Sequence, residues 1–487
     1  MVSTACKRLL LPFLAALALA FPAFSDVTIS GTTTFAALDG SAQDDDHTVN
    51  GTFTVNSNLT VLGTINCNDE GAGNEDACPM RFVVGGNLTL ASGSAIYAEN
   101  RKGSGDGGDV TFTVGGNVNV QGPSGTLGGA IVSTTRVVGA NPSGTDRAGN
   151  ITLNAGGTTT LAAGSTLSAG AVDGRAGTID ITGQGPITAN GNVLAGPSNN
   201  IASTKYTGAV MTGGAAQMTG GSISIRSLTH TEPGLVVGGS AVIATQGETP
   251  GTGSVTLEGC NVQINGLVAS VARAGLGARV VVRSGTDVTI DGSNLGGSGT
   301  HNGMLRADAT LQSANAFHVD VFAANNITIS GPSGSLYALT SNGGATSKDA
   351  SGTINVVSTK GAVTASGNAF AATGSNSGDQ GGTVNVSAKN AVTLNGATIK
   401  AAGDFSSSDG QRAGGHVNVR SYSANVSWQA GVGDVRPVGS SAGVPAGQQG
   451  TISLTYCTTV STAGSSFPTN GAPVGPFPTT TQTCSPA

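Results

Sequence analysis

The stretch GGTVNVSAKNAVTLNGATIKAAG, residues 381–403, contains three short runs in which polar and apolar residues alternate. Glycine, asparagine or lysine separates one run from the next. Alternation with a period of two is typical of half-buried β-strands, and Gly and Asn are typical of tight turns. This segment therefore predicts three short strands joined by tight corners.

The first of these runs, GTVNV at Gly382, recurs along the whole chain. Related runs begin at Gly51, Met80, Gly108, Gly149, Gly177, Gly221, Gly253, Ala278, Phe317, Gly352, Gly415 and Gly450. The thirteen starts are spaced by about 33 residues on average, which is a spacing typical of solenoids, propellers and other repeat architectures.

Two further runs complete the repeat. A second run, often Asn-apolar-Thr-apolar, follows most first runs after a short, nearly constant interval, and it begins at Asn58, Asn87, Asn117, Asn261, Asp287, Asn326, Ala391 and Asn425. The apolar residues of a third, weaker run are Ile96, Leu167, Leu336, Phe370 and Ile399. A return segment of variable length leads to the next repeat.

This repeat predicts an all-β fold, a single-stranded parallel β-helix (β-solenoid) of about 13 coils with roughly three strands per coil. One coil cannot bury its apolar residues alone, whereas stacked coils can, so we expect Val384 to lie between Ile354 and Val417. Glycine is expected at corners that need a positive φ or a close approach of coils. A β-propeller is the alternative, but it would need four strands per unit joined by hairpins.

The N-terminus predicts export, and the predicted domains follow from it. Lys7 and Arg8 precede an apolar run and small residues, which is typical of a signal peptide cut after Ser25. The remaining chain has 19 basic and 27 acidic residues (21 minus two, against 27), a net charge of −8. Without a basic patch we expect no nucleic-acid partner, and no later segment could span a membrane. The predicted divisions are a signal peptide (1–25), an N-terminal cap with the first coils (26–80), a β-helix (81–456) and a Pro-rich C-terminal cap or tail (457–487).

Five cysteines follow the signal peptide, which suits an oxidising compartment. The closest pairs predict two disulfides, Cys67–Cys78 and Cys457–Cys484, each closing a local loop near one end. Cys260 is expected to be a lone buried thiol. The proline content of the C-terminal segment predicts that it cannot continue the strand stack.

The variable return segments leave mostly from one corner, so their charged residues are expected to line one side of the rod, where binding often evolves. These candidate binding residues are Arg101, Lys102, Asp106, Arg136, Asp146, Arg147, Asp173, Arg175, Lys348, Asp349, Asp409 and Arg412. The alternative is that they are passive solvated corners.

Two acidic segments are candidates for chemical sites. The run Gln43 to His47 (QDDDH) resembles the paired acids of β-helix glycosidases, but no His or Arg motif follows at coil spacing. The loop 67–78 holds the weak calcium candidates Asp69, Glu70, Glu75 and Asp76 in a spacing unlike an EF-hand. No histidines have metal-ligand spacing, so no catalytic residue, metal or other cofactor is assigned.

The phrases GGNLTL, GGNVNV, AGNITL and ANNITISG resemble secreted bacterial β-helix proteins of the filamentous-haemagglutinin adhesin type. The resemblance covers roughly residues 27–456 and is architectural, because glycine-rich β-helices share it without sharing function. It implies a non-enzymatic adhesin or extracellular-matrix scaffold, outside the cell or on its surface, that binds glycans, matrix polymers or its own copies. A polysaccharide lyase or glycoside hydrolase on the same scaffold is the alternative.

Overall fold

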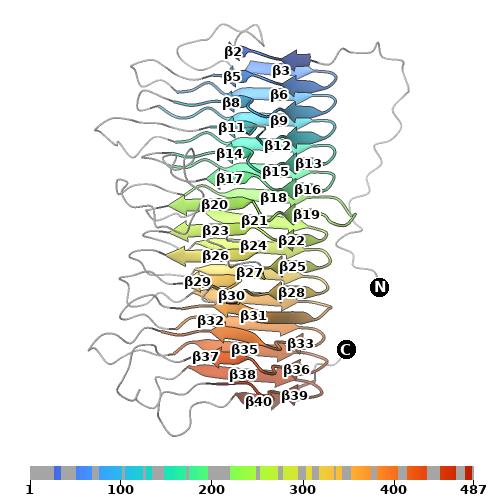
Figure 1. The fold of residues 1–487 in the computed structure, drawn as a ribbon, viewed down its shortest axis with the longest axis vertical. Helices are drawn as coiled ribbons and strands as arrows, with labels where there is room; N and C mark the ends of the chain where they lie inside the picture. The colour runs from blue at the N-terminus through green and yellow to red at the C-terminus, as the bar shows by residue number, and fades with distance from the viewer. Residues whose placement is uncertain are drawn as a thin grey trace, which may run out of the picture.

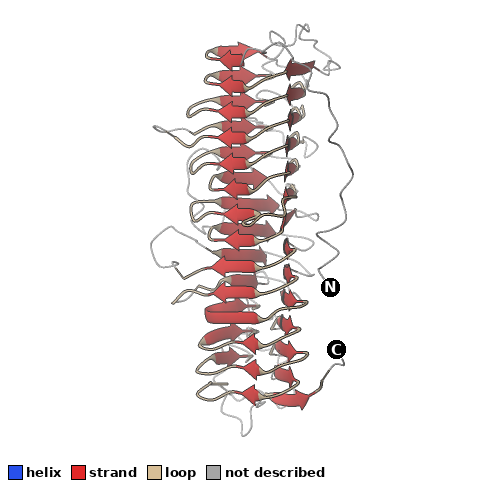
Figure 2. Cartoon of the chain, turned by 90° about the vertical axis from the view of Figure 1, so that its right-hand side faces the viewer, coloured by secondary structure: helices blue, strands red, loops and turns tan. Residues whose placement is uncertain are grey.

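The structure is a computed structural model. It describes residues 27–34, 51–67, 76–100, 105–123, 128–133, 147–171, 175–195, 220–247, 253–272, 278–293, 303–309, 317–333, 336–342, 352–373, 381–403, 414–435, 450–467 and 478–484. Within these ranges the chain contains strands and no helix. The strands stack in columns along one long axis, from β2 and β3 at one end to β39 and β40 at the other (Figure 1). A side view shows the same levels repeated from end to end (Figure 2).

Sheet I contains the first strand of each repeat. Its fourteen parallel strands are β3 (Gly51–Val55), β6 (Met80–Val84), β9 (Val110–Val114), β12 (Ile151–Ala155), β15 (Ile179–Gly183), β18 (Ile223–Ser227), β21 (Ser254–Gly259), β24 (Arg279–Ser284), β27 (His318–Ala323), β30 (Thr353–Ser358), β32 (Thr383–Ala388), β35 (His416–Ser421), β38 (Thr451–Tyr456) and β40 (Thr479–Gln482). At about 4.8 Å per strand this column is about 60 Å long.

Sheet II contains the second strands. They are β1 (Val27–Ile29), β4 (Leu59–Val61), β7 (Leu88–Leu90), β10 (Val118–Val120), β13 (Thr159–Leu161), β16 (Ile187–Ala189), β19 (Leu235–Val237), β22 (Val262–Ile264), β25 (Val288–Asp291), β28 (Ile327–Ser330), β31 (Val363–Ala371), β33 (Val392–Thr393), β36 (Val426–Ser427) and β39 (Val460–Ser461).

Sheet III contains the third strands. They are β2 (Thr32–Thr34), β5 (Thr64–Asn66), β8 (Ala95–Tyr97), β11 (Ala130–Val132), β14 (Thr166–Ser168), β17 (Asn192–Ala195), β20 (Val242–Gly247), β23 (Leu267–Ala272), β26 (Met304–Ala309), β29 (Leu339–Asn342), β34 (Ala397–Lys400) and β37 (Val432–Asp434). The long strand β31 continues from sheet II into sheet III and joins the two.

The parallel register confirms the predicted solenoid. The thirteen predicted first runs overlap the first thirteen strands of sheet I, and Val384 pairs with Ile354 on one side and Val417 on the other. One core residue was wrongly predicted, because Leu336 is exposed and Leu339 instead pairs with Leu305. Leu336 and Leu339 both follow a turn signal. The alternation of polar and apolar residues alone does not show which of the two lies in the strand.

One large apolar core runs through the column, and a small second cluster of Ala244, Leu267, Ala269, Val271 and Met304 is separate from it. Val, Ile, Leu and Ala fill most of it, which explains how 4% aromatic residues are sufficient. The aromatic residues in it also stack between coils. The rings of Phe82 and Phe112 are parallel with centroids 4.8 Å apart, and Trp428 meets Phe467 edge-on at 5.2 Å. Such pairs add to the free energy of burial along the stacking direction.

Glycine recurs before sheet I strands because adjacent coils approach closely there. A Cβ on Gly177 would lie closer than 3.0 Å to the carbonyl group of Gly149, and a Cβ on Gly221 would meet Gly177 in the same way. Neither residue is among the positive-φ glycines, which include Gly93 and Gly164. Of the two reasons expected from the sequence, close approach therefore explains this column, and a positive φ explains only other corners.

Asparagine recurs before sheet II strands because its side chain caps the next coil. The Asn58 Oδ1 atom accepts a hydrogen bond from the Asn87 N–H at 2.7 Å, and Asn87 Oδ1 accepts one from Asn117 N–H at 2.7 Å. Asp287 does the same for Asn326 at 2.8 Å. The following threonine occupies the outward position of the strand, so the coil accounts for the repeated Asn-x-Thr sequences.

The ends differ in part from expectation. The prediction that the C-terminal segment cannot continue the stack is wrong for residues 479–482, because β40 pairs in parallel with β38. No proline lies within β40, so its N–H groups are available to the ladder.

The structure contains both predicted disulfides. The Cα atoms of Cys67 and Cys78 are 5.5 Å apart, and those of Cys457 and Cys484 are 4.5 Å apart. Cys260 is buried and belongs to neither pair. Among the ranges given above, no helix is long and apolar enough to cross a membrane.

Candidate binding surface on sheet I

The variable segments lie mainly where sheet III leads to the next strand of sheet I. Examples are the connections from Val132 to Ile151 and from Ala195 to Ile223. The connections from sheet I to sheet II are short by comparison, as from Val84 to Leu88. Most predicted binding and calcium residues lie outside the described part of the chain, namely Asp69, Glu70, Glu75, Arg101, Lys102, Arg136, Asp146, Asp173, Lys348, Asp349, Asp409 and Arg412.

The four predicted residues that are described form one column at this corner. Asp76 Oδ1 accepts a hydrogen bond from Asp106 N–H at 2.6 Å, and Asp106 Oδ1 accepts one from Arg147 N–H at 2.6 Å. Arg147 in turn forms a parallel bridge with Arg175. The structure therefore brings together residues from the binding set and the calcium set, and it uses both carboxylates to cap backbone N–H groups.

The ionised form of the Asp106 carboxyl group is disfavoured in this column. Burial raises the pKa of Asp106 above its ordinary value, and the nearby Asp76 carboxylate raises it further. The hydrogen bond from Arg147 N–H and the Arg147 charge oppose the rise. Within the described residues, no group of three or more His, Cys, Asp or Glu side chains could hold a metal ion.

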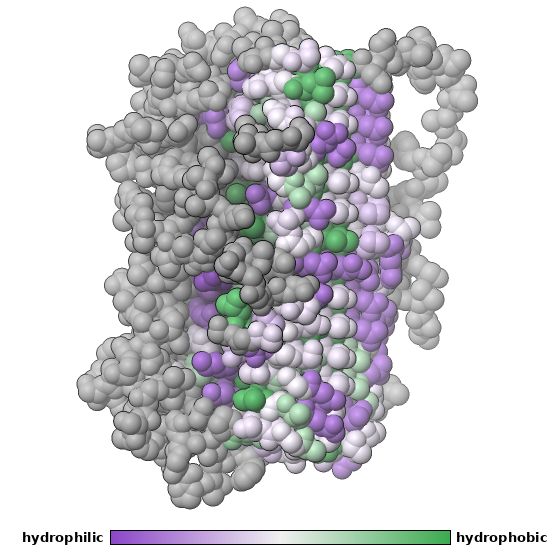
Figure 3. Space-filling view, viewed as in Figure 1, coloured by the Kyte–Doolittle hydropathy of each residue, from purple (hydrophilic) through white to green (hydrophobic). Residues whose placement is uncertain are grey.

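A broader polar surface is formed by the outward residues of sheet I. Because successive strands pair in register, these residues form straight rows along the rod. On the face shown in Figure 3, the residues coloured by hydropathy are mostly hydrophilic or intermediate, and hydrophobic residues occur as small separate spots. Flat rows of side chains with regular spacing can contact an extended ligand at many points.

The middle row contains a hydrogen-bonded amide ladder. The Nδ2 group of Asn418 donates to Asn385 Oδ1 at 2.9 Å, and Asn385 donates to Asn355 at 2.8 Å. Asn355 Nδ2 then donates to Asp320 Oδ1 at 2.8 Å. All these amides point the same way, so the ladder ends on a carboxylate that can only accept.

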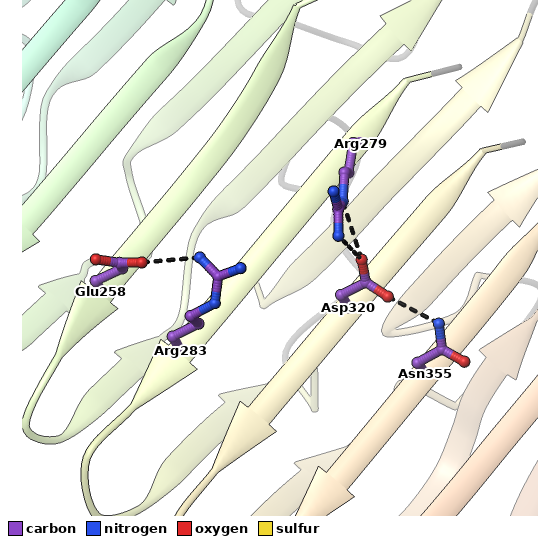
Figure 4. Close-up of polar contacts among 5 residues, drawn as sticks. All are labelled: Glu258, Arg279, Arg283, Asp320 and Asn355. Atoms are coloured by element: carbon purple, nitrogen blue, oxygen red, sulfur yellow. Dashed lines mark hydrogen bonds and ion pairs between the residues drawn. The ribbon is translucent and has the colours of Figure 1, made fainter. Parts of the chain in front are cut away.

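Asp320 is the centre of the charged part of this surface (Figure 4). Its Oδ2 atom accepts hydrogen bonds from Arg279 Nη2 at 2.9 Å and from Arg279 Nε at 3.0 Å. The Asp320 side chain is 5% exposed, whereas the Arg279 side chain is 52% exposed. The carboxylate is therefore covered by its partners, and the guanidinium lies at the surface.

A second ionic cluster adjoins the first. Glu258 lies between two arginines, with Oε1 at 2.8 Å from Arg283 Nη1 and Oε2 at 3.4 Å from Arg226 Nε. Both arginine side chains are more than half exposed, at 51% and 57%, and Glu258 is 28% exposed. Exposed ion pairs of this kind contribute little to stability, about 0 to 1 kcal/mol each.

Three apolar side chains interrupt the polar rows next to these arginines. Phe322 follows Arg283 in the same row and pairs with Val357 on the next strand. Val281 lies between Arg279 and Arg283 on β24 and is buried even though it is in an outward position. Among the outward residues of the described sheet I strands, Phe322 is the aromatic one.

Sequence reasoning did not identify this surface. The runs ARVVV and FHVDV predicted only strands. His416 is exposed and its Nδ1 atom is 2.8 Å from Thr451 Oγ1. The available signal was the presence of charged residues at alternate positions of neighbouring repeats, as in RVVVR after VTLEG.

Comparisons with family models, curated proteins and solved structures found no match to this chain.

Proposed function

We propose that this protein is a secreted, non-enzymatic β-solenoid that acts as an adhesin or extracellular-matrix scaffold.

 The observation that supports it is the outer surface of sheet I, where fourteen strands present straight rows of polar side chains along the rod. The N-terminal sequence and the two cysteine pairs support export. Its proposed partners are surface glycans, matrix polymers or other copies of the chain.

The shape of the surface suits a long polymer better than a small molecule. A small ligand is usually held in a concave pocket that covers most of its surface. An extended polymer can instead contact one strand after another, and many weak contacts add up along the rod. The variable segments border the same sheet, so they can contribute contacts at its edge.

The enzymatic alternative would use Asp320 with Arg279. A lyase or glycosidase needs acidic and basic groups that can reach the sugar bond. Both carboxylate oxygens of Asp320 accept hydrogen bonds from neighbouring side chains, and the side chain is 5% exposed. This arrangement favours a structural role for Asp320 in a surface that binds.

Incubation of the purified mature chain with a panel of polysaccharides, with and without chelator, tests the proposal. We expect retention on at least one polymer without release of products. New reducing ends or unsaturated sugars would support the enzymatic alternative. Retention that depends on a divalent cation would support the calcium candidates. Failure to bind any polymer would contradict the glycan-binding form of the proposal.

A further inference from the structure

We propose that the centre of the sheet I surface binds a carboxylate-bearing polysaccharide that runs along the rod axis. The site, called the arginine patch, consists of Arg226, Glu258, Arg279, Arg283, Asp320 and Phe322. The inference rests on the proposed glycan-binding function and adds the chemical class of the ligand.

Charge is distributed unevenly between sheet I and the rest of the protein. The sheet I strands contain five arginines (Arg81, Arg226, Arg279, Arg283 and Arg420) and three acids (Asp180, Glu258 and Asp320). Their balance is 5 − 3 = +2 with histidines neutral, whereas the whole chain carries −6. An acidic polymer is therefore attracted to this sheet and repelled by the chain as a whole, which favours one face for binding.

Arg279 and Arg283 have guanidinium N–H donors that their acidic partners do not use. Asp320 binds Nε and Nη2 of Arg279, which leaves Nη1, and Glu258 binds Nη1 of Arg283, which leaves Nη2 and Nε. Guanidinium groups have five N–H donors in a planar fork that matches a carboxylate. Because the arginine side chains are more exposed than the acids that they pair with, the remaining donors are available to a ligand above the sheet.

The spacing of the patch suits an extended chain of sugars. Arg226 and Arg283 lie in one row, two strands apart, with Glu258 between them. Two strand spacings are about 9.6 Å. In an extended β-1,4-linked polyuronate, alternate sugars turn the same way, so carboxylates on one side recur at a comparable distance. Each arginine can then receive one carboxylate.

Phe322 supplies the apolar part of the site. It is the next residue in the row after Arg283, and its ring is partly exposed. The C–H face of a sugar ring can pack on an aromatic ring while its polar groups bind the arginines. The acids of the patch would repel a densely charged phosphate backbone, which favours a polyuronate over a nucleic acid.

Binding of matched oligosaccharides to the mature chain tests the inference. The probes are β-1,4-linked mannuronate and β-1,4-linked mannose oligomers of equal length, with single-stranded DNA as a third probe. We expect mannuronate to bind at least about tenfold more tightly than mannose and DNA, because charge-assisted hydrogen bonds form only with its carboxylates. Added salt should weaken the binding.

Two double variants locate the site. Arg226→Gln with Arg283→Gln should weaken mannuronate binding at least about tenfold. Arg81→Gln with Arg420→Gln removes the same charge from the same sheet outside the patch and should change binding less than about twofold. Circular dichroism and hydrogen exchange check that both variants fold.

The outcomes separate the inference from the proposed function. Equal binding of both oligosaccharides, or preference for DNA, would overturn the inference, and so would equal losses in the two double variants. If another polysaccharide of the panel still bound, the proposed function would stand without the arginine patch. If no polysaccharide bound, the inference and the glycan-binding form of the proposed function would both fail.

Discussion

Replacing Gly177 with alanine tests why glycine precedes so many strands of sheet I. The added Cβ would lie closer than 3.0 Å to the carbonyl group of Gly149 on the preceding coil, so the two coils must separate by about 1 Å. The φ of Gly177 is not positive, so crowding and not backbone strain opposes the substitution.

The expected cost follows from three contributions. Overpacking costs about 1 to 3 kcal/mol. One weakened backbone hydrogen bond costs about 0.5 to 1.5 kcal/mol. The reduced conformational freedom of the unfolded chain offsets about 0.4 to 1 kcal/mol of this destabilisation. Gly177→Ala should therefore lower the free energy of unfolding by about 0.5 to 4 kcal/mol.

Gly31→Ala is the matched control, because nothing lies within 4 Å of a Cβ built on Gly31. It should leave stability unchanged or raise it by less than about 1 kcal/mol. Urea unfolding followed by far-ultraviolet circular dichroism measures the total effect, and hydrogen exchange of peptides from β12 and β15 locates it. If Gly177→Ala matched Gly31→Ala in stability and exchange, close approach of coils would not explain the glycine column.

Three further predictions concern the core, the corner and the C-terminal end. Phe112→Ala should destabilise the protein by about 3 to 5 kcal/mol in urea unfolding, because it removes a fully buried ring that stacks on Phe82, and a loss below about 1 kcal/mol would contradict the packing. The raised pKa of Asp106 means that its contribution to stability falls as the pH rises from below its ordinary pKa through the raised value. Asp106→Asn should therefore have the same melting temperature as the wild type at low pH and a higher melting temperature at neutral pH. A lower melting temperature of the variant at neutral pH would refute this. Replacing Cys457 and Cys484 with serine should cost about 3 to 4 kcal/mol in the chain-entropy picture, with faster hydrogen exchange at β40 and β38 but not at β9. Uniformly faster exchange would contradict nearest-neighbour stability.

The fold could be predicted because its signal is repeated in every coil. Alternation gave the strands, and the recurrence of small residues and Asn gave the corners, as in the stretch from Gly382 to Leu394. A register that is specified once per coil is difficult to misplace when one face is buried. The error at Leu336 occurred in a third strand, where the run is short and follows a longer connection.

The surface could not be predicted in the same way, because outward positions place few demands on the sequence. Arg279 and Asp320 are separated by 41 residues, and only the register shows that their side chains meet. The charged residues of the sequence pointed instead to the variable corners, where the Asp76 and Asp106 carboxylates accept hydrogen bonds from the backbone N–H groups of Asp106 and Arg147. The stacking of coils thus creates contacts between residues that are far apart in the sequence, and the sequence alone does not predict these contacts.

Arginine labelling in the presence of bound polymer tests most directly that the strand face of sheet I is the contact surface. The mature chain would be treated with a glyoxal reagent, with and without the polysaccharide that it retains most strongly, and the labelled peptides would be identified by mass spectrometry. The account predicts that the polymer protects Arg226, Arg279 and Arg283 more than Arg101, Arg136 and Arg412 of the variable corners. Protection of the corner arginines alone, or of none, would contradict it.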